Sequence, residues 1–138
     1  MKISLKLEYA CRVLAQLGRR YGSGEWGQID ELAQIENVPR NYLVQILNML
    51  RNGGLLDSRR GKQGGYTLAK PPAEISLYEV VAIVEPELIA ARAALEGQSG
   101  PQVAEVWNTL SERIAGYLKK TTLTNLIATY DGAMMYDI

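Results

Sequence analysis

The chain has 138 residues, of which 47% are apolar, and this is enough for one globular domain with a modest core and a small extension. Its 15 Lys and Arg residues balance its 15 Asp and Glu residues, which excludes attraction of the whole chain to a polyanion, so any contact with nucleic acid must come from a local cluster of positive charge. One cysteine and no histidine exclude an internal disulfide and remove the usual ligands of metal sites and the usual bases of acid–base catalysis, which disfavours an enzyme.

Three helices are predicted in the first third of the chain, because apolar and small residues recur there at the spacing of one buried helical stripe. Their expected ranges are residues 7–21, 28–36 and 39–52. Pro39 suits the first turn of the third helix, since its missing N–H would have no partner there. Gly53 and Gly54 supply a residue able to adopt the left-handed conformation that ends a helix. Only Asn37 and Val38 separate the second and third helices, which predicts a closely coupled pair.

A short hairpin is predicted after the third helix. Strands are expected at residues 55–60 and 66–70, and the glycine-rich segment between them, with Lys62, indicates a flexible basic tip. Pro71 and Pro72 end the hairpin, and residues 75–84 predict a further helix. The predicted order of elements over residues 7–84 is therefore helix, helix, helix, hairpin, helix.

The last third begins with a loop over residues 85–100, where glycines and prolines interrupt the periodicity. Helical spacing then returns for about five turns. The apolar stripe of this long helix consists of Val103, Val106, Trp107, Leu110, Ile114, Tyr117 and Leu118. A shorter helical stretch is expected at residues 123–130.

The long apolar stripe predicts a homodimer, because a domain of this size has too little surface left to cover it. A second copy of the chain would cover it, and two-fold dimers are the commonest assemblies; the alternative is a helix folded back on its own domain. The expected fold is therefore mainly α with a small β-hairpin. It comprises a winged helix-turn-helix domain (1–84), a loop (85–100), and a long dimerisation helix with a C-terminal tail (101–138).

The outward face of the third predicted helix carries mostly amide side chains. At helical spacing it presents Asn41, Val44, Gln45 and Asn48, with Arg40 and Tyr42 at the start of the helix. An amide can bond one base edge in two places, notably N6 and N7 of adenine, and the N-terminal part of a recognition helix is what enters the major groove. The alternative is an ordinary solvated face, because most outward helix faces are polar.

The predicted hairpin adds a local positive patch to this neutral protein. Its basic residues are Arg51, Arg59, Arg60, Lys62 and Lys70, and Asp57 is the single acid among them. Gly61, Gly64 and Gly65 would let a phosphate backbone approach, while Lys62 or a neighbouring arginine reaches phosphates or a narrow minor groove. A merely soluble turn is the alternative for the hairpin alone, but helix, turn, helix and basic hairpin in this order jointly indicate DNA binding.

These segments resemble the Rrf2 family of bacterial winged-helix regulators, over nearly the whole chain. The motifs that carry the resemblance are Met1-Lys2-Ile3-Ser4-x-Lys6-x-x-Tyr9-Ala10, Tyr42-Leu43-x-Gln45-Ile46-Leu47, Leu50-Arg51-x-Gly53-Gly54-Leu55 and Arg60-Gly61-x-x-Gly64-Gly65-Tyr66-x-Leu68. In the long helix, Leu110-Ser111-Glu112-Arg113 and Thr121-Thr122-Leu123-x-x-Leu126 are similar to the segment by which family members dimerise.

The resemblance implies roles for individual side chains. Asn41 and Gln45 match base-reading positions, Tyr42 matches the aromatic at the start of the recognition helix, and Arg60 matches the wing arginine that enters the minor groove. Val44 departs from the family, because some members carry a glutamate there that takes part in sequence discrimination, whereas a valine offers only an apolar contact such as one to a thymine methyl.

The resemblance also raises the question of an iron–sulfur cluster, because the family members that bear one keep three closely spaced cysteines before the long helix. This chain has none there, and iron–sulfur clusters are usually held by four ligands, chiefly cysteine, so we expect no cofactor. Glu8 matches a carboxylate that ligates the cluster in some members, but without cysteines a solvated or ion-paired residue is expected. Cys11 lies on the buried stripe of the first helix and is expected to act as a small apolar group rather than as a redox sensor.

The sequence therefore predicts a DNA-binding transcription regulator, a repressor acting as a homodimer on a pseudo-palindromic operator. The expected DNA-contacting residues are Arg40, Asn41, Tyr42, Gln45, Asn48, Arg59, Arg60, Gly61, Lys62, Gly65 and Tyr66. Alternatives are a winged-helix protein-interaction module, and control through a partner enzyme of cysteine metabolism or through a small ligand bound between the domain and the long helix. The N-terminus lacks the apolar segment of a signal peptide and no apolar run spans a membrane, so a cytoplasmic protein is expected.

Overall fold

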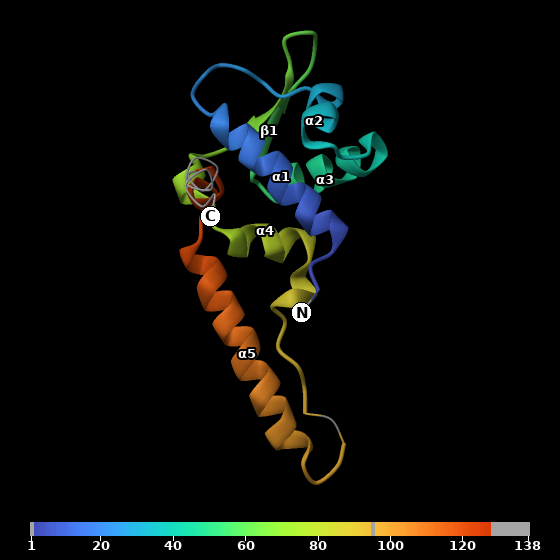
Figure 1. Cartoon of the computed structure of the whole chain (residues 1–138), viewed down its shortest axis with the longest axis vertical. Coiled ribbons are helices and arrows are strands. Elements are labelled where there is room, and N and C mark those ends of the chain that lie inside the picture. Colours follow the sequence, from blue (N-terminus) through green and yellow to red (C-terminus); the bar gives the residue numbers. More distant parts are fainter. Residues whose placement is uncertain (1, 95, 128–138) are drawn as a thin grey trace, which may run out of the picture.

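The computed structural model describes residues 2–94 and 96–127 (Figure 1). It is mainly helical with one two-stranded antiparallel hairpin in this part of the chain, as predicted. The elements are α1 (Leu5–Arg19), α2 (Ile29–Glu36), α3 (Arg40–Asn52), β1 (Leu56–Arg59), β2 (Gly65–Leu68), α4 (Leu77–Val84) and α5 (Gly100–Lys120), with short 3-10 turns at Pro72–Glu74 and Pro86–Leu88. The hairpin and the far end of α5 lie at opposite ends of the longest axis of the molecule.

The helix-turn-helix pair follows from local signals at its turn. Asn37 ends α2 in the left-handed conformation (φ 53), and the next residue, Val38, is buried beneath the turn. Helix α3 begins one residue later than predicted, because Pro39 is its N-cap rather than its first helical residue. The Pro39 carbonyl accepts the first helical hydrogen bond, from the Leu43 N–H (2.9 Å). At the other end of α3, Gly54 adopts the expected positive φ (86°).

The hairpin is short and its register is set by one buried pair. Leu56 lies opposite Leu68, both almost fully buried, and Arg59 lies opposite Gly65 at the last pair before the tip. Both strands are shorter than predicted: β1 covers Leu56–Arg59, and β2 begins one residue earlier than predicted, at Gly65, and ends at Leu68.

Helix α4 begins two residues later than predicted because of a capping box. The Ser76 hydroxyl accepts a hydrogen bond from the Glu79 N–H (3.2 Å), and the Glu79 carboxylate accepts one from the Ser76 N–H (2.9 Å). Ile75 is therefore extended, and its carbonyl accepts a hydrogen bond from the Leu123 N–H (3.0 Å).

The chain returns to the domain after α5. The Leu77 N–H donates to the Thr121 carbonyl (2.8 Å), and the Leu123 side chain is fully buried. Residues 123–127 are helical, and the rest of the stretch predicted at 123–130 lies outside the described residues. The segment after α5 thus packs against the domain that the sequence predicts over residues 1–84.

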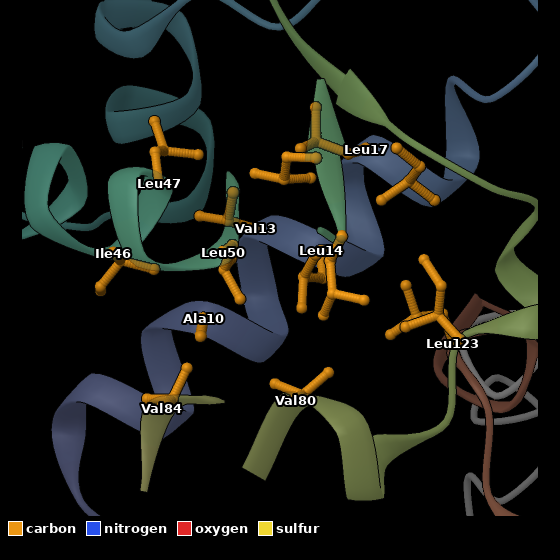
Figure 2. Packing of buried hydrophobic residues seen from close by; sticks show 14 of the residues in the cluster. Ala10, Val13, Leu14, Leu17, Ile46, Leu47, Leu50, Val80, Val84 and Leu123 are labelled. Atoms are coloured by element: carbon orange, nitrogen blue, oxygen red, sulfur yellow. The ribbon is translucent and has the colours of Figure 1, made fainter. Parts of the chain in front are cut away.

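One apolar cluster holds the domain together (Figure 2). It joins the inner face of α1 to that of α3 and α4, with Leu123 added from the C-terminal side. Leu14, Leu47 and Leu50 are fully buried, and burial of each such side chain stabilises the fold by about 1.5–3 kcal/mol. Within the described part of the chain no polar or charged side chain is buried. The cluster therefore fixes α3 by its apolar face and leaves its amide face outward.

Among the described residues, helix α5 contacts the domain through its C-terminal half. Leu118 packs against the core, whereas Val103 and Val106 near its start are 52% and 61% exposed. The segment before α5 runs back along it (Figure 1) and is held by Asn108, whose amide bonds both the N–H and the carbonyl of Arg92 (2.7 and 2.9 Å). Among the described residues, every helix is too short or too polar to cross a lipid bilayer.

Candidate DNA-binding surface

The amide face of α3 is presented to solvent. Asn41, Tyr42 and Gln45 are exposed, and Asn48 is half-buried farther along the helix. The opposite face places four residues in the core: Leu43, Ile46, Leu47 and Leu50. Because that face is fixed by packing, the orientation of the exposed amides is fixed too.

Arg40 links the start of α3 to the start of α2. Its Nε lies 2.6 Å from Asp30 Oδ1, and the two side chains are 58% and 82% exposed. An ion pair this exposed contributes at most about 1 kcal/mol, so a DNA phosphate can replace Asp30 as the partner of Arg40 at little cost.

Two α1 residues that sequence reasoning did not place at the site support Tyr42. The Tyr42 ring meets the Tyr9 ring edge-on, with 5.8 Å between centroids. The Arg12 guanidinium lies 5.5 Å from the Tyr9 centroid and also donates to the Glu36 carbonyl (3.3 Å). The signal available in the sequence was the motif around Tyr9, but the pairing joins separate helices and no local pattern reveals it.

The three glycines of the hairpin tip differ in their surroundings. Gly61 (φ 100) faces open space, as the approach of a phosphate requires. A Cβ at Gly64 would lie 2.0 Å from the Arg59 carbonyl oxygen, and one at Gly65 (φ 134) would lie 2.4 Å from the Gly27 carbonyl oxygen. Gly64 and Gly65 are therefore required by the packing of the hairpin itself.

Four of the five predicted basic residues gather on one side of the hairpin. Arg51, Arg59, Arg60 and Lys62 line a groove between the hairpin tip and the start of α2. Arg60 and Lys62 are exposed, while the Arg59 guanidinium lies over the Trp26 ring, 4.4 Å from its centroid. Tyr66, also predicted to contact DNA, is half-buried in β2 and packs against the core.

Lys70 does not belong to this patch, which corrects the sequence interpretation. Its ammonium lies 2.7 Å from the Glu79 carboxylate in α4. Burial opposes ionisation of Glu79, but the hydrogen bonds from Lys70 and from Ser76 outweigh it and lower the pKa of the carboxyl. The positive charge of Lys70 is therefore compensated within the domain.

Comparison with known proteins decides the family. The Rrf2 model, described as an iron-dependent transcriptional regulator, matches residues 3–129. The chain belongs to the Rrf2 family. An HTH-type transcriptional regulator of Mycobacterium tuberculosis is 37% identical over 91% of this chain and 81% of its own length. CymR of Bacillus subtilis is 33% identical over 96% of this chain and 94% of its own length.

Solved structures agree with this assignment. The global cysteine regulator CymR of B. subtilis superposes with a TM-score of 0.80 at 29% identity, covering 94% of this chain and 98% of its own. IscR of T. potens also gives 0.80, at 25% identity, over 100% of this chain and 94% of its own. The winged-helix fold and the family are as predicted, and the chain is a DNA-binding transcriptional regulator rather than an enzyme.

The donor set of this Rrf2 protein does not fit an iron–sulfur cluster. Its single cysteine, Cys11, lies on α1, and burial, followed by the charge of Glu8, raises the pKa of the thiol to about 11. A thiol with this pKa is protonated at neutral pH, whereas the thiolate is the form that ligates metal. Glu8 is itself paired with Arg12 (2.8 Å), and no group of three potential metal ligands occurs among the residues described.

The predicted dimerisation residues of α5 divide into two sets. Ile114 and Leu118 are half-buried and, with the edge of the more exposed Tyr117, line a cavity of about 450 Å³ between α1, α4 and α5. The other five project from the helix: Val103, Val106, Trp107, Leu110 and Tyr117, each 47–68% exposed. The α5 ridge, as we name these five residues, is the apolar surface left uncovered along the helix.

Proposed function

We propose that this protein is a sequence-specific repressor that binds a pseudo-palindromic operator as a homodimer, in the cytoplasm and without an iron–sulfur cluster. The observation that carries the proposal is the joint exposure of the α3 amides and the basic hairpin tip on one rigid domain. Amides on a recognition helix read base edges in the major groove, and a basic wing contacts the backbone or the flanking minor groove.

The homodimer is supported by the α5 ridge. Five large apolar side chains along one projecting helix are unusual on a monomer, and a second copy would remove them from water. A two-fold axis also repeats α3, and two copies of one reading surface match the two halves of a pseudo-palindrome.

Repression requires fewer additional contacts than activation does. A dimer that occupies two successive major grooves excludes other proteins from the same DNA without touching the transcription machinery. The protein-interaction alternative predicts a hairpin without an exposed basic tip, whereas Arg60 and Lys62 are both exposed here.

Control of binding has two candidate routes. CymR, a relative by sequence and fold, is the global cysteine regulator of B. subtilis, and this favours a signal from cysteine metabolism. A partner enzyme is the carrier of that signal that the family resemblance implies. The cavity between α1, α4 and α5 favours a small apolar ligand instead, because its lining is almost wholly apolar, for example Leu7, Val81 and Ile114. A pull-down with the purified chain and a ligand-dependent thermal shift distinguish the two routes.

The proposal is tested by selecting genomic fragments with the purified protein and footprinting them at several salt concentrations. We expect protection of two half-sites about one helical turn apart, with affinity that falls as salt rises. Equal affinity for all duplexes would contradict sequence-specific repression, and a monomer in sedimentation would contradict the dimer.

A further inference from the structure

The tip of the hairpin is held by the segment that leads into α2. Gly27 and Tyr66 exchange two backbone hydrogen bonds, each 2.8 Å long, and so add a short bridge beside β2. One residue later, the Gln28 side-chain amide donates to the Lys62 carbonyl at the tip itself (2.6 Å). This segment crosses the hairpin in Figure 1 before it enters α2.

Arg59 takes part in the same attachment. Its guanidinium lies 4.4 Å from the centroid of the Trp26 ring, and its Nη2 donates to the Gln63 carbonyl (2.9 Å). Trp26 is half-buried, so its ring holds a defined orientation under the arginine. One donor and one face of the Arg59 guanidinium are thus engaged by the protein, although Arg59 is exposed, as is Arg60, next in sequence.

An attachment of this kind is needed because the hairpin alone is weak. Its ladder has four residue pairs and ends at Arg59 and Gly65, so residues 60–64 extend beyond the last pair. A two-stranded hairpin is at best marginally stable in water. Without contacts from residues 26–28, the tip would sample many positions relative to α3.

We propose that Trp26, Gln28 and Arg59 are positioning residues for DNA binding: they fix the hairpin tip relative to α3, and Arg59 serves this purpose instead of contacting phosphate. The wing and the recognition helix then form one rigid reading unit, joined through the residues that precede α2. This inference rests on the proposed operator binding and concerns the geometry of the same surface.

The experiment compares Trp26→Ala, Trp26→Phe, Arg59→Ala and Lys62→Ala in the full-length protein, with the selected operator as probe. Trp26→Ala is expected to lower affinity about fivefold, the size of an exposed cation–π contact, with its salt dependence unchanged because no charge is lost. Protection of the flanking minor grooves is expected to weaken more than protection of the central major grooves. Trp26→Phe retains a ring face and is expected to recover most of the affinity.

Arg59 and Lys62 give the decisive contrast, because both substitutions remove one positive charge. Lys62→Ala is expected to reduce the slope of log K against log salt by about 0.9, as for one lost phosphate contact. Arg59→Ala is expected to keep the wild-type slope and to weaken binding as Trp26→Ala does. Tyr21→Ala is the matched control, because Tyr21 is an exposed aromatic in the same loop, and it is expected to bind as the wild type does.

A slope for Arg59→Ala that falls like that of Lys62→Ala would overturn the inference, as would Trp26→Ala with wild-type affinity and flanking protection. If the wild type binds no duplex, the proposed function fails, and amide hydrogen exchange still tests the attachment. Faster exchange of the Gly64 N–H in Trp26→Ala than in Tyr21→Ala supports it, and equal exchange contradicts it.

Discussion

The domain and the long helix α5 differ in how far their apolar side chains are buried. In the domain, α1, α3 and α4 enclose their own leucines and valines, with Leu14 and Leu50 fully buried. Along α5 the corresponding side chains face solvent, with Val106 61% and Tyr117 68% exposed. The domain is thus stabilised within one chain, whereas the α5 ridge gains stability only when a second surface covers it. Protein concentration should therefore affect the two ends unequally.

Leu50→Ala tests the self-contained end and should have the largest effect. Removing a fully buried leucine leaves a cavity, and we expect the free energy of unfolding to fall by about 2–5 kcal/mol. Urea denaturation followed by circular dichroism measures this loss. A loss below about 1 kcal/mol would show that α3 is not anchored through Leu50.

Trp107→Ala tests the other end. Truncating a central aromatic of an interface costs about 2 kcal/mol or more of association free energy, so we expect dissociation at concentrations where the wild type is dimeric. Sedimentation velocity over a dilution series measures this, with far-ultraviolet circular dichroism unchanged as evidence of folding. Gln102→Ala is the control, because Gln102 is exposed and lies outside the α5 ridge.

Arg60→Ala tests the DNA-binding surface separately from the domain core and the α5 ridge, because it should affect neither folding nor dimerisation. If Arg60 contacts bases in the minor groove, we expect operator affinity to fall by about 1–3 kcal/mol, with a loss of discrimination at the flanking positions. Gel shifts with operators mutated at those positions measure it. Lys120→Ala removes a positive charge at the C-terminal end of α5, outside the groove that Arg60 lines, and an equal effect of both variants would assign Arg60 only a general electrostatic role.

Glu79→Gln should have the smallest effect and should depend on pH. The pKa of Glu79 is lowered in the folded state from an ordinary value of 4.5, so its charge stabilises the fold above that value, and this contribution is lost as pH falls through the folded pKa. Glutamine retains the capping bond, so we expect a loss below about 1 kcal/mol at pH 7 that disappears in acid. Denaturation at several pH values measures the difference, and a difference that grows in acid would contradict it.

Local patterns accounted for the elements and for the exposed face of α3. The apolar spacing placed the inner face of α3 correctly and most of that of α1, where Leu7, Ala10 and Leu14 are buried but the predicted Tyr21 is exposed beyond the end of the helix. Gly54 has the backbone conformation expected of it. These predictions succeeded because each depends on residues within one or two helical turns of each other.

Features that join distant segments could not be predicted in this way. Leu123 enters the core, Trp26 supports Arg59 and Glu79 neutralises Lys70, and each contact pairs residues from separate elements. The sequence shows that a tryptophan or a glutamate is present, but the partner follows only from the folded arrangement. The start of α4 was missed for a different reason, since Ser76 and Glu79 form a recognisable capping box that the apolar pattern of residues 75–84 obscured.

The paired backbone bonds of Ile75 and Leu77 with Leu123 and Thr121 make the base of α5 a stiff joint. The helix has 21 residues, so at 1.5 Å per residue it forms a lever about 30 Å long. A tilt of about 5° at the joint would move its free tip by about 3 Å, close to the rise of one base pair along B-DNA. In the proposed homodimer, small adjustments where α4 meets residues 121–123 would therefore be amplified into a change in the distance between the two α3 helices.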